Sequence, residues 1–245
     1  MFERIPLREV RNKYNHKLQI WNAADYWHFH LHKNYRRILK AREELLCGGR
    51  ILNLGSASEN YNISNLDMVY LDVAEKSLPR DQHAVCGDGH RMPFSSRSFR
   101  SIIAIGSVLN YCAPTELFIE VSRVIEEKGY FLFDFEQSAA YEHYGTEIYG
   151  KSSYLFLTDF NDLDETIWVF SLNHVKALLN AAGFDIVDVI NIHTLSSLIW
   201  RLTESNVATS ISCGIDQIFC NIPVLRNRSS NVFIIARRTT SKSVS

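Results

Sequence analysis

The stretch RILNLGSASEN (Arg50–Asn60) decides how the rest of the chain is interpreted. An apolar run, Ile51–Leu54, passes directly into a turn of small residues that begins at Gly55. In proteins that alternate strands and helices, a strand followed by such a turn often holds a cofactor. A cofactor turn usually contains several glycines, and this one keeps only Gly55. The surrounding sequence has to show whether the turn still serves that purpose.

Apolar runs recur along the chain and alternate with helix-like segments. Seven runs have the length and composition of strands: Ile51–Leu54, Met68–Leu71, His83–Cys86, Ser101–Ile105, Tyr130–Phe135, Phe184–Ile190 and Val232–Ala236. Three segments repeat apolar residues every three or four positions and are predicted as helices: Trp21–Leu46, a helix that Pro114 opens and Gly129 closes, and a helix from Ser171 to Gly183. This alternation predicts an α/β fold with a mostly parallel sheet and helices on both faces.

Ligands of such sheets bind at the carboxyl ends of the strands, so the residues that follow each predicted strand bear on function. Asp72 ends the second strand, where an acid can accept hydrogen bonds from both hydroxyls of a ribose. Asp88 follows the third strand, where a carboxylate can accept from the exocyclic amine of a purine. Together with the Gly55 turn, these acids fit a cofactor that contains a ribose and a purine.

Five segments in their order resemble a known family. LNLGSA, VYLDVAEKSL, CGDGHRMPFSSRSFRSIIAIGSVLNY, SRVIEEKGYFLFDF and NHVKALLNAAGFDIVDV look like a class I S-adenosylmethionine-dependent methyltransferase over residues 50–189. The most specific piece is D-x-x-x-x-P-F followed by S-F, here Asp88, Pro93, Phe94, Ser98 and Phe99. The resemblance implies a Rossmann-like sheet of seven strands with an antiparallel last strand, and S-adenosylmethionine as cofactor.

The resemblance also implies roles for single residues. The turn at Gly55 would approach the methionine part of the cofactor, Asp72 would hold the ribose, and Asp88 would meet the adenine amine. Gly106 and the residues after it would lie near the sulfonium, and the aromatic N-terminal helix would cover the site. The expected cofactor-binding residues are Asn53, Gly55, Ser56, Ala57, Asp72, Val73, Asp88, Gly89, His90 and Gly106.

The chain departs from the family pattern in the cofactor turn. Asn53 stands where the family has an acid, and Ala57 and Glu59 replace the second and third glycines. Arg100 stands where an acid usually follows S-F. Glycine allows a positive φ and removes Cβ where backbone meets ligand. The charge of Glu59 would repel the cofactor's carboxylate unless the side chain points outward, so these departures concern cofactor affinity rather than the fold.

We expect methyl transfer to an oxygen or nitrogen atom of a small molecule by in-line displacement, which needs positioning and exclusion of water. His143, in the segment after the fifth strand, is the candidate base. Asn110, Tyr111 and Tyr144 are candidate substrate contacts, with a structural role as the alternative for each. The altered turn leaves open a non-catalytic scaffold or partner subunit, and the fold also admits another reaction such as a cyclisation. The absence of G-x-G-x-x-G argues against a nicotinamide dehydrogenase.

Other candidate features lie near the predicted pocket. Tyr14 and Lys17 are candidate contacts for the cofactor's carboxylate, with a helix-surface role as the alternative. Asp134 and Glu136 share a face at the end of the fifth strand. His28 and His32 share a helix face while His30 points away, so no metal site is expected.

The composition limits the partners. The 245 residues carry a formal net charge of −1, which argues against a dedicated nucleic-acid binder. No apolar stretch is long enough for a spanning helix, so no stable membrane insertion is expected. The N-terminus has no signal-like apolar core, and five cysteines without a C-x-x-C pair favour reduced thiols in the cytoplasm. A small-molecule substrate is the expected partner.

The expected organisation is one structural domain: an N-terminal helical cap (1–48), an α/β domain (49–238) and a frayed tail (239–245). Within it, residues 193–230 form an apolar excursion between the last two strands. This excursion has three interpretations that stay open: a lid, the surface of a homodimer, or core packing.

Overall fold

The computed structural model describes residues 4–16, 25–63, 67–80, 82–159, 164–220, 222, 225 and 227–240. Lys17 and the first residues of the helix predicted from Trp21 lie outside the described residues, as does the end of the predicted frayed tail.

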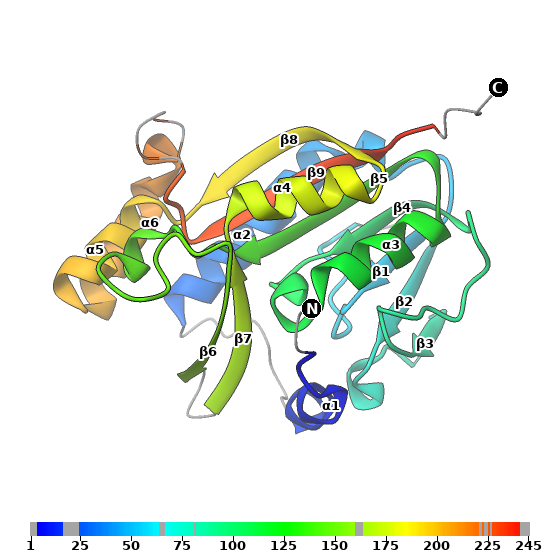
Figure 1. Ribbon diagram of the computed structural model, residues 1–245, viewed down its shortest axis with the longest axis horizontal. Helices are drawn as coiled ribbons and strands as arrows, with labels where there is room; N and C mark the ends of the chain where they lie inside the picture. Colours follow the sequence, from blue (N-terminus) through cyan, green and yellow to red (C-terminus); the bar gives the residue numbers. More distant parts are fainter. Residues whose placement is uncertain are drawn as a thin grey trace.

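A seven-stranded sheet forms the centre of the molecule (Figure 1), with strand order β3-β2-β1-β4-β5-β9-β8. Only β9 runs antiparallel to its neighbours, β5 and β8. The strands are β1 (Ile51–Leu54), β2 (Met68–Asp72), β3 (Ala84–Cys86), β4 (Phe99–Ala104), β5 (Ile125–Glu136), β8 (Phe184–Ile192) and β9 (Asn231–Arg238). The Rossmann-like sheet expected from the sequence is therefore confirmed, including its antiparallel last strand.

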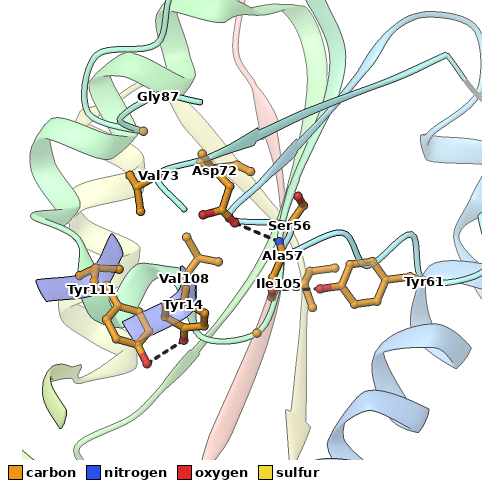
Figure 2. A pocket seen from close by; sticks show the side chains of 15 residues that line it. Tyr14, Ser56, Ala57, Tyr61, Asp72, Val73, Gly87, Ile105, Val108 and Tyr111 are labelled. Atoms are coloured by element: carbon orange, nitrogen blue, oxygen red, sulfur yellow. Dashed lines mark hydrogen bonds between the residues drawn. The ribbon is translucent and has the colours of Figure 1, made fainter. Parts of the chain in front are cut away.

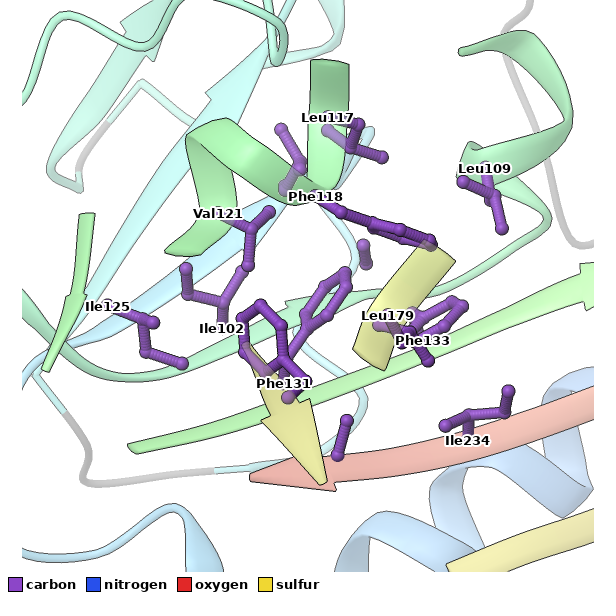
Figure 3. Close-up of a cluster of buried hydrophobic side chains, with 14 of the residues drawn as sticks. Ile102, Leu109, Leu117, Phe118, Val121, Ile125, Phe131, Phe133, Leu179 and Ile234 are labelled. Carbon is purple, nitrogen blue, oxygen red and sulfur yellow. The ribbon is translucent and has the colours of Figure 1, made fainter. Parts of the chain in front are cut away.

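Helices cover both faces of this sheet. Helices α3 (Pro114–Val124) and α4 (Leu172–Ala181) pack on one face, and α2 (Tyr26–Ala41) packs on the other. Strand β5 shows why, because side chains alternate along a strand. Phe131 and Phe133 point to the cluster beneath α3 and α4 (Figure 3), whereas Leu132 points to α2.

The remaining helices are α1 (Leu7–His16), α5 (Leu195–Thr203) and α6 (Asn206–Phe219). Short 3-10 turns are η1 (Glu43–Leu45), η2 (Glu75–Ser77), η3 (Val108–Tyr111) and η4 (Tyr141–His143). Helices α5 and α6 occupy the predicted excursion and lie at one end of the molecule (Figure 1). No helix in the described ranges combines the length and apolarity that crossing a membrane requires.

Gly129 does not close the helix that begins at Pro114, and this prediction was wrong. Helix α3 ends at Val124 and β5 begins with the next residue. A Cβ on Gly129 would lie 2.7 Å from the carbonyl oxygen of Arg100. The glycine is therefore explained by the close approach of β4 to β5, where the pairing register also shifts between Phe99 and Ser101.

A second sheet was not predicted. It is a hairpin of β6 (Ser153–Asp159) and β7 (Asp164–Phe170), which projects from the strand-end side of the main sheet (Figure 1). The hairpin is joined to the main body by a bridge between Gln137 and Phe170. It brings Glu165 close to the strand ends where function was expected.

Candidate functional site

A pocket of about 690 Å³, including the part open to solvent, lies at the carboxyl ends of the central strands (Figure 2). The lining residues are Val10, Tyr14, Leu54, Gly55, Ser56, Ala57, Tyr61, Asp72, Val73, Gly87, Gly89, Ile105, Gly106, Val108 and Tyr111. Most of the expected cofactor-binding residues are among them; Asn53, Asp88 and His90 are not.

The turn after β1 keeps its shape without the second and third glycines. Gly55 has φ +65°, and a Cβ there would lie 2.6 Å from Cγ2 of Val108. Ala57 and Ser58 also adopt positive φ values, of +41° and +65°. The backbone N–H of Ala57 donates to Oδ2 of Asp72 at 3.0 Å, which fixes the turn against the end of β2.

Asp72 combines two structural bonds with access to the pocket. Its Oδ1 accepts from the N–H of Ala74 at 2.8 Å, and its Oδ2 accepts from Ala57. Burial raises the pKa of this carboxyl, although the backbone N–H donors oppose the shift. Each carboxylate oxygen has a second lone pair, so the side chain can also accept from a ligand hydroxyl.

Asp88 is held from behind by His90. Its Oδ1 accepts from the N–H and from Nδ1 of His90, at 2.9 and 2.7 Å. Nε2 of His90 accepts from the N–H of Ala113 at 3.0 Å, so the ring is the tautomer protonated on Nδ1. Burial opposes ionisation of Asp88, but the bonds from His90 leave its pKa lowered. His90 therefore orients Asp88, while the neighbouring Gly87 and Gly89 line the pocket.

Glu59 turns away from the pocket. Its Oε1 accepts from the N–H of Tyr61 at 2.7 Å, and its Oε2 lies 3.2 Å from Nε2 of His32 on α2. Asn53, which stands at the family's acid position, donates from its side chain to the carbonyl of Glu59 at 2.8 Å. Burial opposes ionisation, yet these partners leave the pKa of Glu59 lowered. The charge expected to repel a cofactor is therefore engaged with α2.

Asp134 organises the loop after β4. It is fully buried and accepts from Tyr35 Oη at 2.5 Å, from Gly106 N at 2.7 Å and from Ser107 N at 3.1 Å. Burial raises its pKa to about 6, although these donors oppose the shift. Asp134 thus fixes the backbone that lines the pocket at Gly106.

A chain of hydrogen-bonded polar side chains runs from the pocket lining to the hairpin. The hydroxyl of Tyr14 donates to the Tyr111 hydroxyl at 3.0 Å (Figure 2), and Tyr111 in turn donates to Glu165 of the hairpin. Glu165 is buried and also pairs with Lys13 of α1. Burial and the nearby Glu165 raise the pKa of Tyr14, and burial also raises that of Tyr111.

Three other predicted site residues lie outside the pocket lining. Asn110 is buried, and its amide binds the backbone of Glu136 and the carbonyl of Trp168. Tyr144 is 59% exposed. The ring of His143 packs edge-on against Phe156, and burial lowers its pKa.

Some pocket residues were missed. Val10 and Tyr61 were not singled out, nor was Glu165, which bonds to the pocket residue Tyr111. The aromatic helix predicted to cover the site packs on the sheet as α2, while α1 supplies Val10 and Tyr14 to the pocket. The alternation of Ile167 and Val169 on the buried face of β7 was the available signal for the hairpin, and the acidic Glu165 interrupts it. Among the described residues, no cluster of metal-ligating side chains forms, at the α2 histidines or elsewhere.

Comparison with known proteins gives three kinds of result. Residues 46–133 match a family described as a methyltransferase domain. No curated protein matches the sequence significantly. Solved structures match over most of their length, but their sequence identity to this chain is so low that the match shows only a shared fold.

The fold is shared with geranyl diphosphate C-methyltransferase from Streptomyces coelicolor A3(2), at a TM-score of 0.61 and 10% identity over 96% of this chain and 99% of that one. An S-adenosylmethionine-dependent methyltransferase from Clostridium acetobutylicum ATCC 824 gives a TM-score of 0.54 and 12% identity over 95% and 99%. The [4+2]-cyclase SpnF gives 0.53 and 13% over 85% and 82%.

The strand order and the domain match together define a class I methyltransferase fold. Residues 46–133 thus match a methyltransferase domain, and the chain shares the fold of solved methyltransferases, including one described as S-adenosylmethionine-dependent.

Proposed function

We propose that the chain transfers the methyl group of S-adenosylmethionine to an oxygen or nitrogen atom of a small molecule. The observation that carries this proposal is the meeting of two features at one pocket: the turn held by Asp72, and the hydrogen-bonded chain from Tyr14 through Tyr111 to Glu165. The first is suited to a nucleoside cofactor, and the second supplies a proton acceptor for the molecule to be methylated.

The residues of the turn fit the cofactor. Ser56 lines the pocket, and its buried side-chain oxygen has no hydrogen-bond partner among the residues that the structure describes. A buried hydroxyl without a partner is costly, and a polar ligand group would relieve that cost. In our assignment, Gly55, Ser56 and Ala57 hold the methionine part of the cofactor.

The other assignments follow the strand ends. Asp72, with Val73 beside it, would hold the ribose hydroxyls. Asp88 and Gly89 would meet the adenine, with His90 orienting Asp88, and Gly106 would lie near the sulfonium. Asn53 supports the turn from behind through its bond to Glu59.

The bound cofactor supplies a methyl group on a sulfonium that is already activated. The protein then has to align the acceptor, exclude water and take up the proton that an O–H or N–H acceptor loses. We assign proton acceptance to Glu165 acting through Tyr111, because Tyr111 lines the pocket and donates a hydrogen bond to the buried Glu165. His143 remains the alternative base, and Asn110 and Tyr144 remain candidate contacts for a large substrate.

Calorimetric titration tests the cofactor site. The protein should bind S-adenosylmethionine and S-adenosylhomocysteine, and Asp72→Ala should weaken both by about 1–3 kcal/mol, the usual effect of losing a buried hydrogen bond. Asp67→Ala, at the exposed opposite end of β2, is the matched control and should bind normally. Folded protein that binds neither ligand at millimolar concentration would refute the proposal and favour the non-catalytic scaffold.

A panel of phenols, amines and carboxylic acids, assayed by release of S-adenosylhomocysteine, tests the chemistry. With any acceptor found, Tyr111→Phe and Glu165→Gln should lower kcat by roughly 100-fold or more without changing cofactor affinity, as for loss of a general base. His143→Gln should have little effect. The reverse pattern would assign the base to His143, and a product without a new methyl group would indicate a cyclisation like that named for SpnF.

A further inference from the structure

Helix α6 has its polarity inverted. Its outward face carries Val207, Ile211, Ile215 and Ile218, which are 72%, 71%, 50% and 68% exposed. Its inward face carries small or polar residues, all of them buried: Thr209, Ser212, Cys213 and Asp216. A helix on the surface of a globular protein normally shows the opposite arrangement. The outward face therefore needs an explanation that packing among the residues the structure describes does not give.

The inward face cannot exchange with the outward one, because Asp216 fixes the roll of the helix. Its Oδ1 accepts from the N–H groups of Thr194 and Leu195 at 3.0 and 2.6 Å. Its Oδ2 accepts from the hydroxyl of Ser196 at 2.6 Å. These bonds pair backbone N–H groups at the start of α5 that would otherwise lack a partner, and they keep the isoleucines pointing outward.

The outward face has the spacing of a helix-pairing seam. Val207, Ile211, Gly214 and Ile218 are separated by four, three and four residues, as in the a and d positions of a heptad. Gly214 lies at the centre of the seam, and a Cβ on it would have nothing within 4 Å. Glycine is among the weakest helix formers, and no contact in the described part of the chain requires it here. A glycine at this place lets a second helix approach closely.

The charge of the region argues for a particular occupant. Asp216 is the sole charged residue of α6, and it is buried. The sequence contains no lysine or arginine from Leu202 to Leu225, whereas helices that lie on membranes carry basic residues on or beside their apolar face. An uncharged, self-complementary stripe can meet a copy of itself without repulsion or a buried unpaired charge.

We propose that α6 is the interface of a homodimer, in which two copies of the helix pack antiparallel across a two-fold axis at Gly214. The axis places Ile211 of each copy against Ile218 of the other, so the contact is isologous and closed. The four branched side chains expose on the order of 400 Å², about half of what each partner contributes to an interface of standard size. Residues beside the stripe, such as the exposed Leu202, supply further surface.

Light scattering after size exclusion, repeated over the micromolar range, tests this proposal. The unaltered chain should be a dimer. Gly214→Lys should raise the dimer Kd by roughly 100-fold or more, because two ammonium groups would face each other at the axis. Since lysine is a better helix former than glycine and the position is open, the variant should keep the circular dichroism spectrum of the unaltered chain. Ile119→Lys, at a 60% exposed position on α3, is the matched control and should remain dimeric.

Cross-linking tests whether the two copies of α6 meet at position 214. In a background that lacks the exposed Cys47 and Cys86, Gly214→Cys should form a disulfide-linked dimer on mild oxidation, and Ile119→Cys should not. The proposal would be overturned if the unaltered chain were a monomer, or if the Gly214→Lys variant remained a dimer. It would also be overturned if the unaltered chain floated with vesicles of phosphatidylcholine and phosphatidylglycerol and the Gly214→Lys variant did not. None of these outcomes depends on cofactor binding or methyl transfer.

Discussion

Some residues at the strand ends both form the pocket wall and keep an atom that can bind a ligand. Asp72 shows this arrangement, since both of its oxygens already bind backbone N–H groups and the side chain still lines the pocket. Gly55 shows the steric counterpart. Ala57 and Ser58 adopt positive φ despite their side chains, so the proximity of Val108 is the stronger reason for glycine at position 55.

Glu136 provides a prediction at the residue scale. Burial, followed by repulsion from Glu142 and Glu165, raises its pKa to about 8 from an ordinary value of 4.5. Between pH 4.5 and pH 8 the folded chain therefore keeps a proton that the unfolded chain releases, and this contribution to stability falls as pH rises through that window. Glu136→Gln removes the titration, so the free energy of unfolding should decline less between pH 6 and pH 9.

Urea denaturation at several pH values measures that slope. Glu75→Gln, at an exposed position on η2, is the control and should leave the slope unchanged. An identical slope in Glu136→Gln and the unaltered chain would contradict the raised pKa.

At the scale of elements, the turn after β1 replaces two glycines with a network of polar contacts. Glu59 links the turn to α2 through His32 and holds the N–H of Tyr61, a pocket residue with φ +53°. The acid that stands in the family's glycine position thus has a structural task. Its sequence neighbours gave no sign of this, because His32 comes from a helix 27 positions earlier.

Glu59→Ala should therefore destabilise the chain by about 1–2 kcal/mol, through the unpaired N–H of Tyr61 and the loss of the His32 contact. It should not strengthen the binding of S-adenosylmethionine. Urea denaturation and calorimetric titration measure the two effects. Glu59→Gln keeps an acceptor for the N–H of Tyr61, so its stability should lie between that of the unaltered chain and that of Glu59→Ala. Tighter cofactor binding by either variant would show that Glu59 does hinder the cofactor.

The main sheet was predictable because most of its strands, such as β1, β2 and β4, are apolar runs buried on both faces, a local property of the sequence. The β6–β7 hairpin was not predicted, because its buried face includes Glu165, an acid in a place where an apolar residue is expected. Glu165 is buried there through its bonds to Lys13 and Tyr111. Such partners meet only in the folded chain, so the sequence pattern around Glu165 cannot reveal them.

At the scale of the whole molecule, the two N-terminal helices differ in how firmly they are attached. Helix α2 buries Tyr35 and Leu39 completely, whereas no residue of α1 is fully buried. Helix α1 meets the body through polar contacts near η2 and through the bonds of Tyr14 and Lys13 to Tyr111 and Glu165. Isolated helices as short as α1 are marginally stable in water.

The domain boundaries predicted at residues 48 and 238 remain predictions.

Hydrogen exchange should show this difference. In the free protein, amides of α1 should exchange at least roughly tenfold faster than those of α2, because regions with little buried surface open at low cost. Saturating S-adenosylhomocysteine should slow exchange in α1, since Val10 and Tyr14 line the pocket, and should leave β5 and β9 unchanged. Equal protection of α1 and α2 in the free protein would contradict the prediction.

The carboxylate of Asp134 has a consequence for how the chain folds. It joins β5 to Tyr35 on α2, 99 positions away, and to Gly106 and Ser107, 28 and 27 positions away. Contacts of such sequence separation form late, after the segments between them have closed into loops. The loop at Gly106 can take its final shape only when α2, β4 and β5 have all docked, so partly folded chains lack a complete pocket. A cofactor that binds only the finished pocket will draw the folding equilibrium toward the complete fold.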